Sequence, residues 1–180
     1  MIDPLNGNQI LRIVKRAIPL WRYSDIIKKE TLPDILGPHG DAIIWMANAK
    51  TPEVGHWTCV KMEERAKRVT FFSSYGGKPD EEKNMKMTEE ELIRTNQLPN
   101  WLLHQLQLLR RMGYSIHYND AKYQVTGDRS MSCGAWVAHY LTFPASVESF
   151  NAYVDHMCRL YRTNYHEYIA DWLLRQKYNE

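Results

Sequence analysis

The spacing of apolar residues along the chain predicts an alternation of helices and short strands. Residues 8–18 repeat apolar side chains at helical spacing, and a short second helix is expected over 24–29. The run 41–48 (DAIIWMAN) is short, apolar and bounded by turn residues, as a buried strand is. Residues 56–73 hold two β-rich runs around a charged turn at 63–66, so they predict a hairpin.

The geometry of this hairpin places two polar residues opposite each other. If the turn is centred between Glu64 and Arg65, the numbers of opposed residues add up to about 129, which places His56 across from Ser73 at the open end. The next stretch, 76–87, is polar and rich in Gly, Lys and Glu, so an exposed loop is expected there.

The second half of the chain is mainly helical in pattern. Thr88 and Glu91 form a capping box for a short helix, and Asn100 is placed to cap a longer one. A half-buried strand is expected over 114–118, where residues alternate between two faces. Helical spacing predicts further helices over 101–112, 133–141, 146–161 and 165–173.

Composition narrows the class of protein. The 180 residues, 44% hydrophobic and 24% charged, suit one folded domain over 1–180. A formal net charge of +2 does not indicate nucleic acid or a membrane surface as partner. The odd count of three cysteines favours a reducing compartment. Without a secretory signal or a membrane-length apolar run, we expect a soluble intracellular protein.

Residues 124–141 (QVTGDRSMSCGAWVAHYL) carry the first chemical signal. A polar loop runs into Cys133 and Gly134 and then into an apolar helical pattern, so Cys133 is expected in the first turn of a buried helix. The unpaired N–H groups and the helix dipole favour thiolate there, and Gly134 leaves room for a substrate backbone. The alternative is that Cys133 is a small core residue.

Cysteine acyl-transfer chemistry needs further groups around the thiolate. His56 stands at a strand start and can serve as its base, and Gln124 offers an amide N–H that can join the Cys133 backbone N–H in an oxyanion hole. Cys59 and Cys158 fit core positions. The other histidines do not cluster with cysteines at zinc-ligand spacing, so neither a metal site nor another cofactor is expected.

Four segments in order resemble the adenovirus-protease (adenain) family of cysteine peptidases. Its relatives are the SUMO-specific proteases and the maturation proteases of large DNA viruses and virophages. The match spans roughly residues 41–145. The segments are Gly55-His56-Trp57, Phe71-Phe72-Ser73-Ser74-Tyr75-Gly76, Gln124 and Cys133-Gly134-Ala135-Trp136.

The resemblance implies an α+β fold in which a small mixed central sheet, carrying His56, packs against helices, with the nucleophile at the N-terminus of a buried helix. It implies Cys133 as nucleophile, His56 as base and Gln124 in the oxyanion hole. Trp57 would wall a narrow channel that admits small residues, so glycine-containing cleavage sites are expected, with Trp57 and Gly134 as substrate-binding residues.

One position departs from the family pattern. The acidic slot falls on Ser73, whose hydroxyl can orient an imidazole but carries no charge. Three explanations follow: a Cys–His dyad with neutral support from Ser73, a carboxylate from elsewhere such as Asp80 or Asp120, or an attenuated enzyme. We favour the first.

The resemblance also suggests a biological setting. The short chain is more like a viral protease that cuts capsid or core precursors than a cellular SUMO protease, so a monomer in the virion or the host-cell cytoplasm is expected. Alternatives are a protease for ubiquitin-like modifiers and a catalytically weak scaffold protein. Family members that use DNA or a peptide as activator keep such a partner open, although the basic C-terminal residues Arg159, Arg162, Arg175 and Lys177 better fit a solvated helix face.

Overall fold

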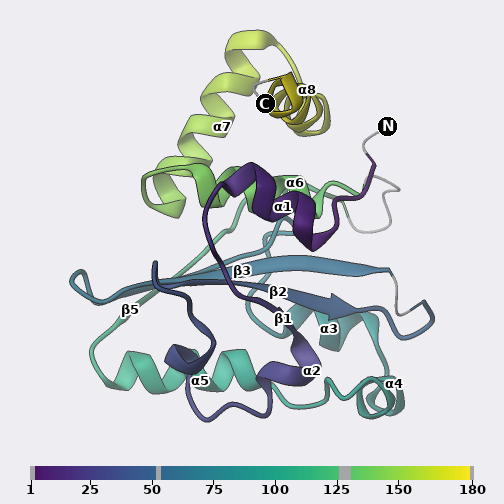
Figure 1. The fold of residues 1–180 in the computed structure, drawn as a ribbon, viewed down its shortest axis with the longest axis vertical. Coiled ribbons are helices and arrows are strands. Elements are labelled where there is room, and N and C mark those ends of the chain that lie inside the picture. The colour runs from purple at the N-terminus through teal and green to yellow at the C-terminus, as the bar shows by residue number, and fades with distance from the viewer. Residues whose placement is uncertain (1–2, 52–53, 126–130, 179–180) are drawn as a thin grey trace.

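A five-stranded mixed sheet runs through the middle of the molecule, with helices on both of its faces (Figure 1). The computed structural model describes residues 3–51, 54–125 and 131–178. The outer pairs β1–β2 and β4–β5 are parallel, and the pairs between them are antiparallel. This confirms the predicted α+β class with a small mixed sheet. In spatial order the strands are β1 (Leu20–Arg22), β2 (Asp41–Ala47), β3 (Gly55–Glu63), β4 (Arg68–Phe72) and β5 (Ser115–Tyr118).

The helices form one layer on each face of the sheet. Figure 1 shows one layer on the side of the N-terminal helix and the other on the opposite side. The first layer contains α1 (Gly7–Val14), α6 (Cys133–Thr142), α7 (Val147–Tyr161) and α8 (Tyr165–Tyr178). The second contains α2 (Tyr23–Ile26), α3 (Glu81–Lys86), α4 (Glu89–Arg94) and α5 (Trp101–Arg111). Within the described ranges, no helix combines the length and apolar character that a membrane span requires.

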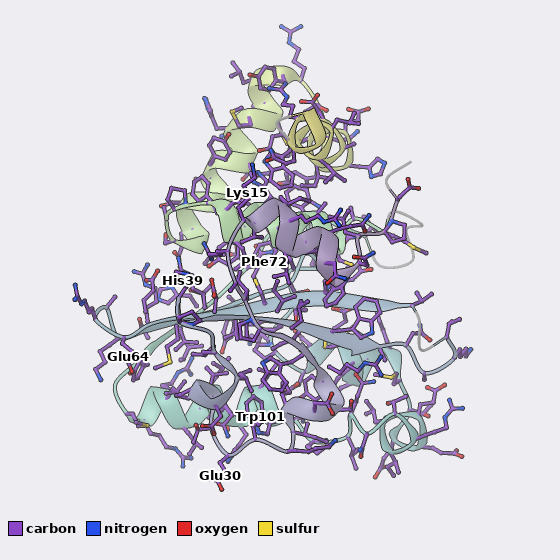
Figure 2. The ribbon with its side chains drawn as sticks, viewed as in Figure 1. Lys15, Glu30, His39, Glu64, Phe72 and Trp101 are labelled. Carbon is purple, nitrogen blue, oxygen red and sulfur yellow. The ribbon has the colours of Figure 1, made fainter. Side chains whose placement is uncertain are left out.

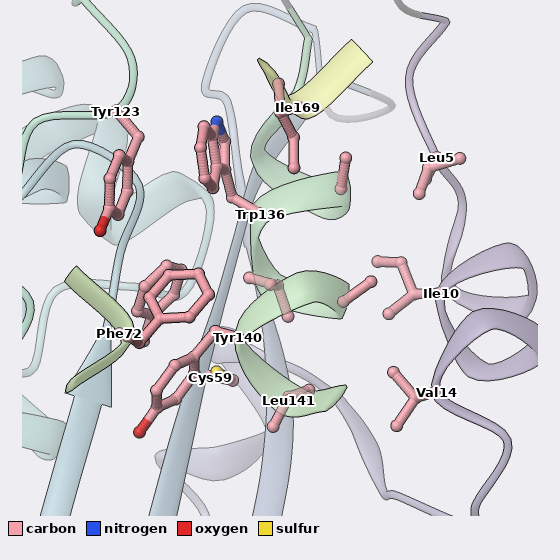
Figure 3. Close-up of a cluster of buried hydrophobic side chains, with 14 of the residues drawn as sticks. Leu5, Ile10, Val14, Cys59, Phe72, Tyr123, Trp136, Tyr140, Leu141 and Ile169 are labelled. Atoms are coloured by element: carbon pink, nitrogen blue, oxygen red, sulfur yellow. The ribbon is translucent and has the colours of Figure 1, made fainter. Parts of the chain in front are cut away.

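Two apolar cores lie between the sheet and the helices, one on each face of the sheet. On the α6 side, the Phe72 ring stacks on Tyr140 with centroids 4.5 Å apart, and Trp136 stacks on Tyr123 at 4.2 Å (Figure 3). Trp101 lies in the other core, so Phe72 and Trp101 are on opposite sides of the sheet (Figure 2). Adjacent strand residues point to opposite faces, which lets the apolar β4 serve both cores.

The β3–β4 hairpin forms as predicted, but its register differs. Cys59 pairs with Phe72 and Glu63 with Arg68, so the expectation that His56 lies directly across from Ser73 is wrong. The turn covers 64–67 instead of 63–66, and Lys67 takes a left-handed conformation with φ of 47° before β4 begins.

The segment expected as an exposed loop contains α3, and this is the main correction to the predicted elements. Lys83 of α3 is buried and its ammonium donates to the Asn100 side-chain oxygen at 3.0 Å. Asn100 therefore does not cap α5 with its side chain. The capping box formed by Thr88 and Glu91 is confirmed.

Candidate active site

Cys133 is the first residue of α6, and every residue from Cys133 to Leu141 is buried. The helix is buried on all sides because α1, the sheet and the C-terminal helices surround it. Its N-terminal end lies beside the start of β3, where backbone N–H groups of Trp57 and Gly134 hydrogen-bond to the Cys133 sulfur. The sequence prediction of a cysteine opening a buried helix is confirmed.

The protonation state of Cys133 differs from the expectation. Burial raises the pKa of the thiol, and the negative charge of Glu82 acts in the same direction, against the hydrogen bonds from the backbone. The helix start alone therefore does not favour thiolate here. The sulfur is held as a thiol near neutral pH and needs a base to lose its proton.

His56 lies at the start of β3 with its imidazole buried. Its Nε2 is 3.0 Å from the Ser73 hydroxyl oxygen, and the Tyr75 ring packs against it with centroids 4.6 Å apart. Burial lowers the pKa of His56 to about 3, and the positive charge of Lys86 acts in the same direction. The imidazole is consequently neutral near pH 7, so its second ring nitrogen carries a free lone pair.

The structure brings His56 and Ser73 into contact. The Cys133 thiol contacts not His56 itself but the backbone of the next residue, Trp57. The Trp57 backbone, next to His56 in the chain, is the part of β3 that hydrogen-bonds to Cys133. Among the described hydrogen bonds, none joins the His56 ring to the Cys133 thiol. The two groups therefore share one end of the sheet without a direct hydrogen bond.

Gln124 is buried, and its side chain has a defined orientation. The Ser74 hydroxyl donates to the Gln124 Oε1 atom, and the Gln124 backbone N–H donates to the Ser74 carbonyl oxygen at 3.0 Å. With Oε1 held by Ser74, the two amide N–H donors lie at the opposite end of the group. This arrangement suits a donor role, and the oxyanion role of Gln124 stays a prediction.

The two predicted substrate-binding residues pack against the N-terminal segment. Trp57 Nε1 donates to the Leu5 carbonyl oxygen at 3.0 Å, and its ring lies 4.5 Å from that of Trp45. A Cβ on Gly134 would come within 3.0 Å of Leu5 and 3.3 Å of Ile10 and Trp57. Glycine at 134 therefore allows α6 to pack closely on this segment. Contact with substrate stays a prediction for both residues.

Neither carboxylate suggested as a partner for His56 serves that purpose among the described contacts. Asp80 accepts a hydrogen bond from the Tyr23 hydroxyl and another from the Leu103 backbone N–H at 2.8 Å. Asp120 accepts from the Asn151 side chain at 3.2 Å. Asp80 thus ties the start of α3 to α2 and α5.

The carboxylate that does lie next to His56 is Glu82, which the sequence analysis missed. Its Oε2 atom is 3.2 Å from His56 Nε2, and its Oε1 atom is 2.5 Å from the Lys86 ammonium. The spacing of Glu82 and Lys86, four residues apart, was a signal for a helix. It carried no information on which histidine that helix would face.

A cavity of about 360 Å³ opens beside this group of residues. His56, Tyr75, Glu82 and Lys86 line one part of it. Apolar side chains at the ends of β2 and α3, including Met46 and Met87, line another part. A chain segment bound there would therefore lie against the imidazole and its neighbours.

We compared the chain with protein-family models and with solved structures. No protein-family model matches it. Among solved structures, it resembles the ASFV pS273R protease at 16% identity and a TM-score of 0.34, covering 64% of this chain and 39% of that one. It also resembles ChlaDub1 from Chlamydia trachomatis at 17% identity and a TM-score of 0.40, covering 97% of this chain and 79% of that one.

A virophage protein gives the sequence match. The chain is 30% identical to "Uncharacterized protein V9" of Sputnik virophage over 168 residues, which cover 92% of this chain and 91% of V9. A match of this extent at this identity establishes common family membership. The chain therefore belongs to the same family as the V9 protein of Sputnik virophage.

Proposed function

We propose that the chain is a cysteine endopeptidase with Cys133 as nucleophile and His56 as base. The observation that carries the proposal is a neutral imidazole, oriented by Ser73 at 3.0 Å, at the end of the sheet where a buried thiol opens α6. The order of these residues along the chain, with Gln124 between them, is also that of the adenain-like peptidases that the sequence resembles.

The residues support a two-step acyl transfer. His56 takes the proton from Cys133 as the sulfur attacks the peptide carbonyl carbon, and it then gives that proton to the leaving amine as the C–N bond breaks. Water hydrolyses the resulting thioester with His56 as base. Gln124 and the Cys133 backbone N–H would hold the oxyanion. Since catalytic hydrogen bonds often tighten only in the substrate complex, the thiol and the imidazole must approach each other there.

The proposed substrates are capsid or core precursors cut at glycine-containing sites, in the virion or the host-cell cytoplasm. The viral origin of V9 supports this setting. The half-buried Trp57, fixed between Leu5 and Trp45, is suited to wall a channel for small residues. A ubiquitin-like modifier with a C-terminal di-glycine is the alternative substrate for the same chemistry.

A catalytically weak scaffold protein is the second candidate, favoured by the raised pKa of Cys133 and the uncharged residue at Ser73. Such a protein would keep the fold and the family's binding surfaces with little turnover.

Peptide-library cleavage under reducing conditions separates these functions. Wild type, Cys133→Ala and the matched control Cys158→Ala are compared, with a folded ubiquitin-like fusion as a separate substrate. We expect cleavage of short glycine-containing peptides by wild type and Cys158→Ala only. Cleavage of the fusion alone would favour the modifier protease, and no cleavage of either substrate would favour the scaffold protein.

A further inference from the structure

The Glu82 side chain is placed unusually for a helix-surface glutamate. Its Oε2 atom is buried, lies 3.2 Å from His56 Nε2 and has no well-formed hydrogen bond among the described residues. Burying a carboxylate oxygen without a hydrogen-bond donor costs folding free energy. The position of Glu82 Oε2 next to an imidazole and a hydroxyl therefore suggests a role in the site. Its neighbour Ser73 also interacts with it and lowers the pKa of the Glu82 carboxyl.

The other carboxylate oxygen of Glu82, Oε1, forms an ion pair with the Lys86 ammonium. Burial raises the pKa of Glu82, while the hydrogen bond and the charge of Lys86 oppose that rise. The Lys86 ammonium also lies over the Tyr75 ring at 4.0 Å, and Tyr75 packs on His56. Lys86 thereby favours the ionised form of Glu82. It also contacts the Tyr75 ring that packs against the His56 imidazole.

An ionised Glu82 carboxylate determines which atoms of His56 and Ser73 donate hydrogen bonds and which accept them. A carboxylate only accepts, so the Ser73 O–H is the group that can donate toward Glu82, and the Ser73 oxygen is then left to accept from His56 Nε2–H at 3.0 Å. The Tyr75 backbone N–H already donates to the Ser73 oxygen at 3.3 Å. The arrangement therefore favours the tautomer with hydrogen on Nε2, which leaves Nδ1 as the ring atom that can accept a proton.

We infer that Glu82 is the positioning carboxylate of this site: supplied by α3 rather than by the end of β4, it fixes the Nε2–H tautomer of His56 through Ser73, and its charge lies 3.2 Å from the imidazole. It also stabilises the imidazolium that forms when the thiol proton moves to His56. The inference rests on the proposed function, because the imidazolium forms only if His56 acts as a base. Asp80 supports the placement, since its bonds to Tyr23 and Leu103 anchor the start of α3.

The test compares Glu82→Gln with the matched control Glu90→Gln, an exposed glutamate of the neighbouring α4. The first readout is the ¹⁵N chemical shifts of the His56 ring by NMR, which report the tautomer without requiring turnover. The second is peptide cleavage, resolved into kcat and KM. A third variant, Ser73→Asp combined with Glu82→Gln, returns a carboxylate to the other side of the imidazole. Thermal unfolding checks that each variant is folded.

We expect the Nε2–H tautomer to dominate in wild type and Glu90→Gln, and to lose that dominance in Glu82→Gln. The loss of kcat in Glu82→Gln should be about ten- to a hundredfold, with little change in KM, because the geometry is kept and only the charge is lost. The double variant should recover most of it. Equal tautomer populations and equal kcat in Glu82→Gln and Glu90→Gln would overturn the inference.

The two readouts separate this inference from the proposed function. If wild type cleaves nothing but Glu82→Gln changes the tautomer, the peptidase proposal fails and the positioning role stands. If wild type is active and Glu82→Gln is indistinguishable from Glu90→Gln, the peptidase stands and Glu82 is only structural.

Discussion

His56 and Ser73 meet diagonally across the β3–β4 hairpin, with Nε2 of one 3.0 Å from Oγ of the other. The register that pairs Cys59 with Phe72 puts them two positions out of direct opposition, on the same face of the sheet. Diagonal neighbours of this kind are within reach of long or aromatic side chains. The contact therefore exists because the imidazole extends along the strand.

Removing the Ser73 hydroxyl should impair turnover more than binding. In Ser73→Ala the imidazole loses the group that orients it, so we expect kcat to fall by about tenfold with KM little changed. Steady-state kinetics on a cleavable peptide measures this, with the exposed Ser115→Ala at the far end of β5 as control. A change in KM alone would show that Ser73 binds substrate and does not orient His56.

The orientation of Gln124 by Ser74 gives a graded prediction. Gln124→Ala removes the proposed oxyanion donor and should lower kcat by about 10²–10³-fold, whereas Ser74→Ala only loosens that donor and should cost roughly tenfold. The exposed Gln107→Ala on α5 is the control. If Ser74→Ala lowered kcat as much as Gln124→Ala, the ranking of direct and indirect roles would be wrong.

Gly134 should matter for stability. In Gly134→Ala the new methyl group would lie 3.0 Å from Leu5 and 3.3 Å from Trp57, so the free energy of unfolding should fall by about 1–3 kcal/mol. Gly77→Ala is the matched control, because a Cβ there meets only a flexible Glu81 oxygen at 3.7 Å. Urea denaturation of both variants measures the difference. Equal stability would mean that the N-terminal segment yields easily.

The buried histidines predict a loss of stability in mild acid. His139 Nε2 lies 2.8 Å from the Tyr168 hydroxyl, and burial lowers the pKa of His139 from 6.5 to about 4. Below about pH 6.5 the unfolded chain binds a proton that the folded chain does not. The free energy of unfolding should therefore fall as pH decreases toward 4, by up to about 1.4 kcal/mol per pH unit for this residue.

Urea denaturation at pH 7 and pH 5 tests this, with His139→Gln to remove the titrating group and the exposed His104→Gln as control. The pH dependence should shrink only in the His139 variant. An unchanged dependence would show that other groups dominate acid unfolding.

The elements that the sequence predicted well are those whose own residues determine them. Cys133 opens an apolar helix, and the Thr88–Glu91 capping box is formed by local hydrogen bonds. The hairpin was predicted but not its register, because the turn lies one residue later, at 64–67, with Lys67 in a left-handed conformation that the sequence did not indicate.

Glu82 could not be predicted for a different reason. The helix α3 is short and polar, and tertiary contacts place it: Lys83 inserts among Asn84, Asn100 and the Leu98 carbonyl oxygen, and Asp80 bonds to Tyr23. Partners this distant in the chain leave no local pattern. Glu82 could therefore not be assigned to His56 from sequence, while Ser73 could be noticed as an uncharged residue in an acidic slot.

Covalent trapping tests whether Cys133 is a nucleophile that His56 activates. A glycine-ended peptide vinyl sulfone is incubated near neutral pH with wild type, His56→Ala and Cys158→Ala, and adducts are mapped by mass spectrometry. We expect one adduct, on Cys133, in wild type and Cys158→Ala, and little or none in His56→Ala. Labelling of Cys133 no faster than of Cys158, or equal labelling in His56→Ala, would contradict it.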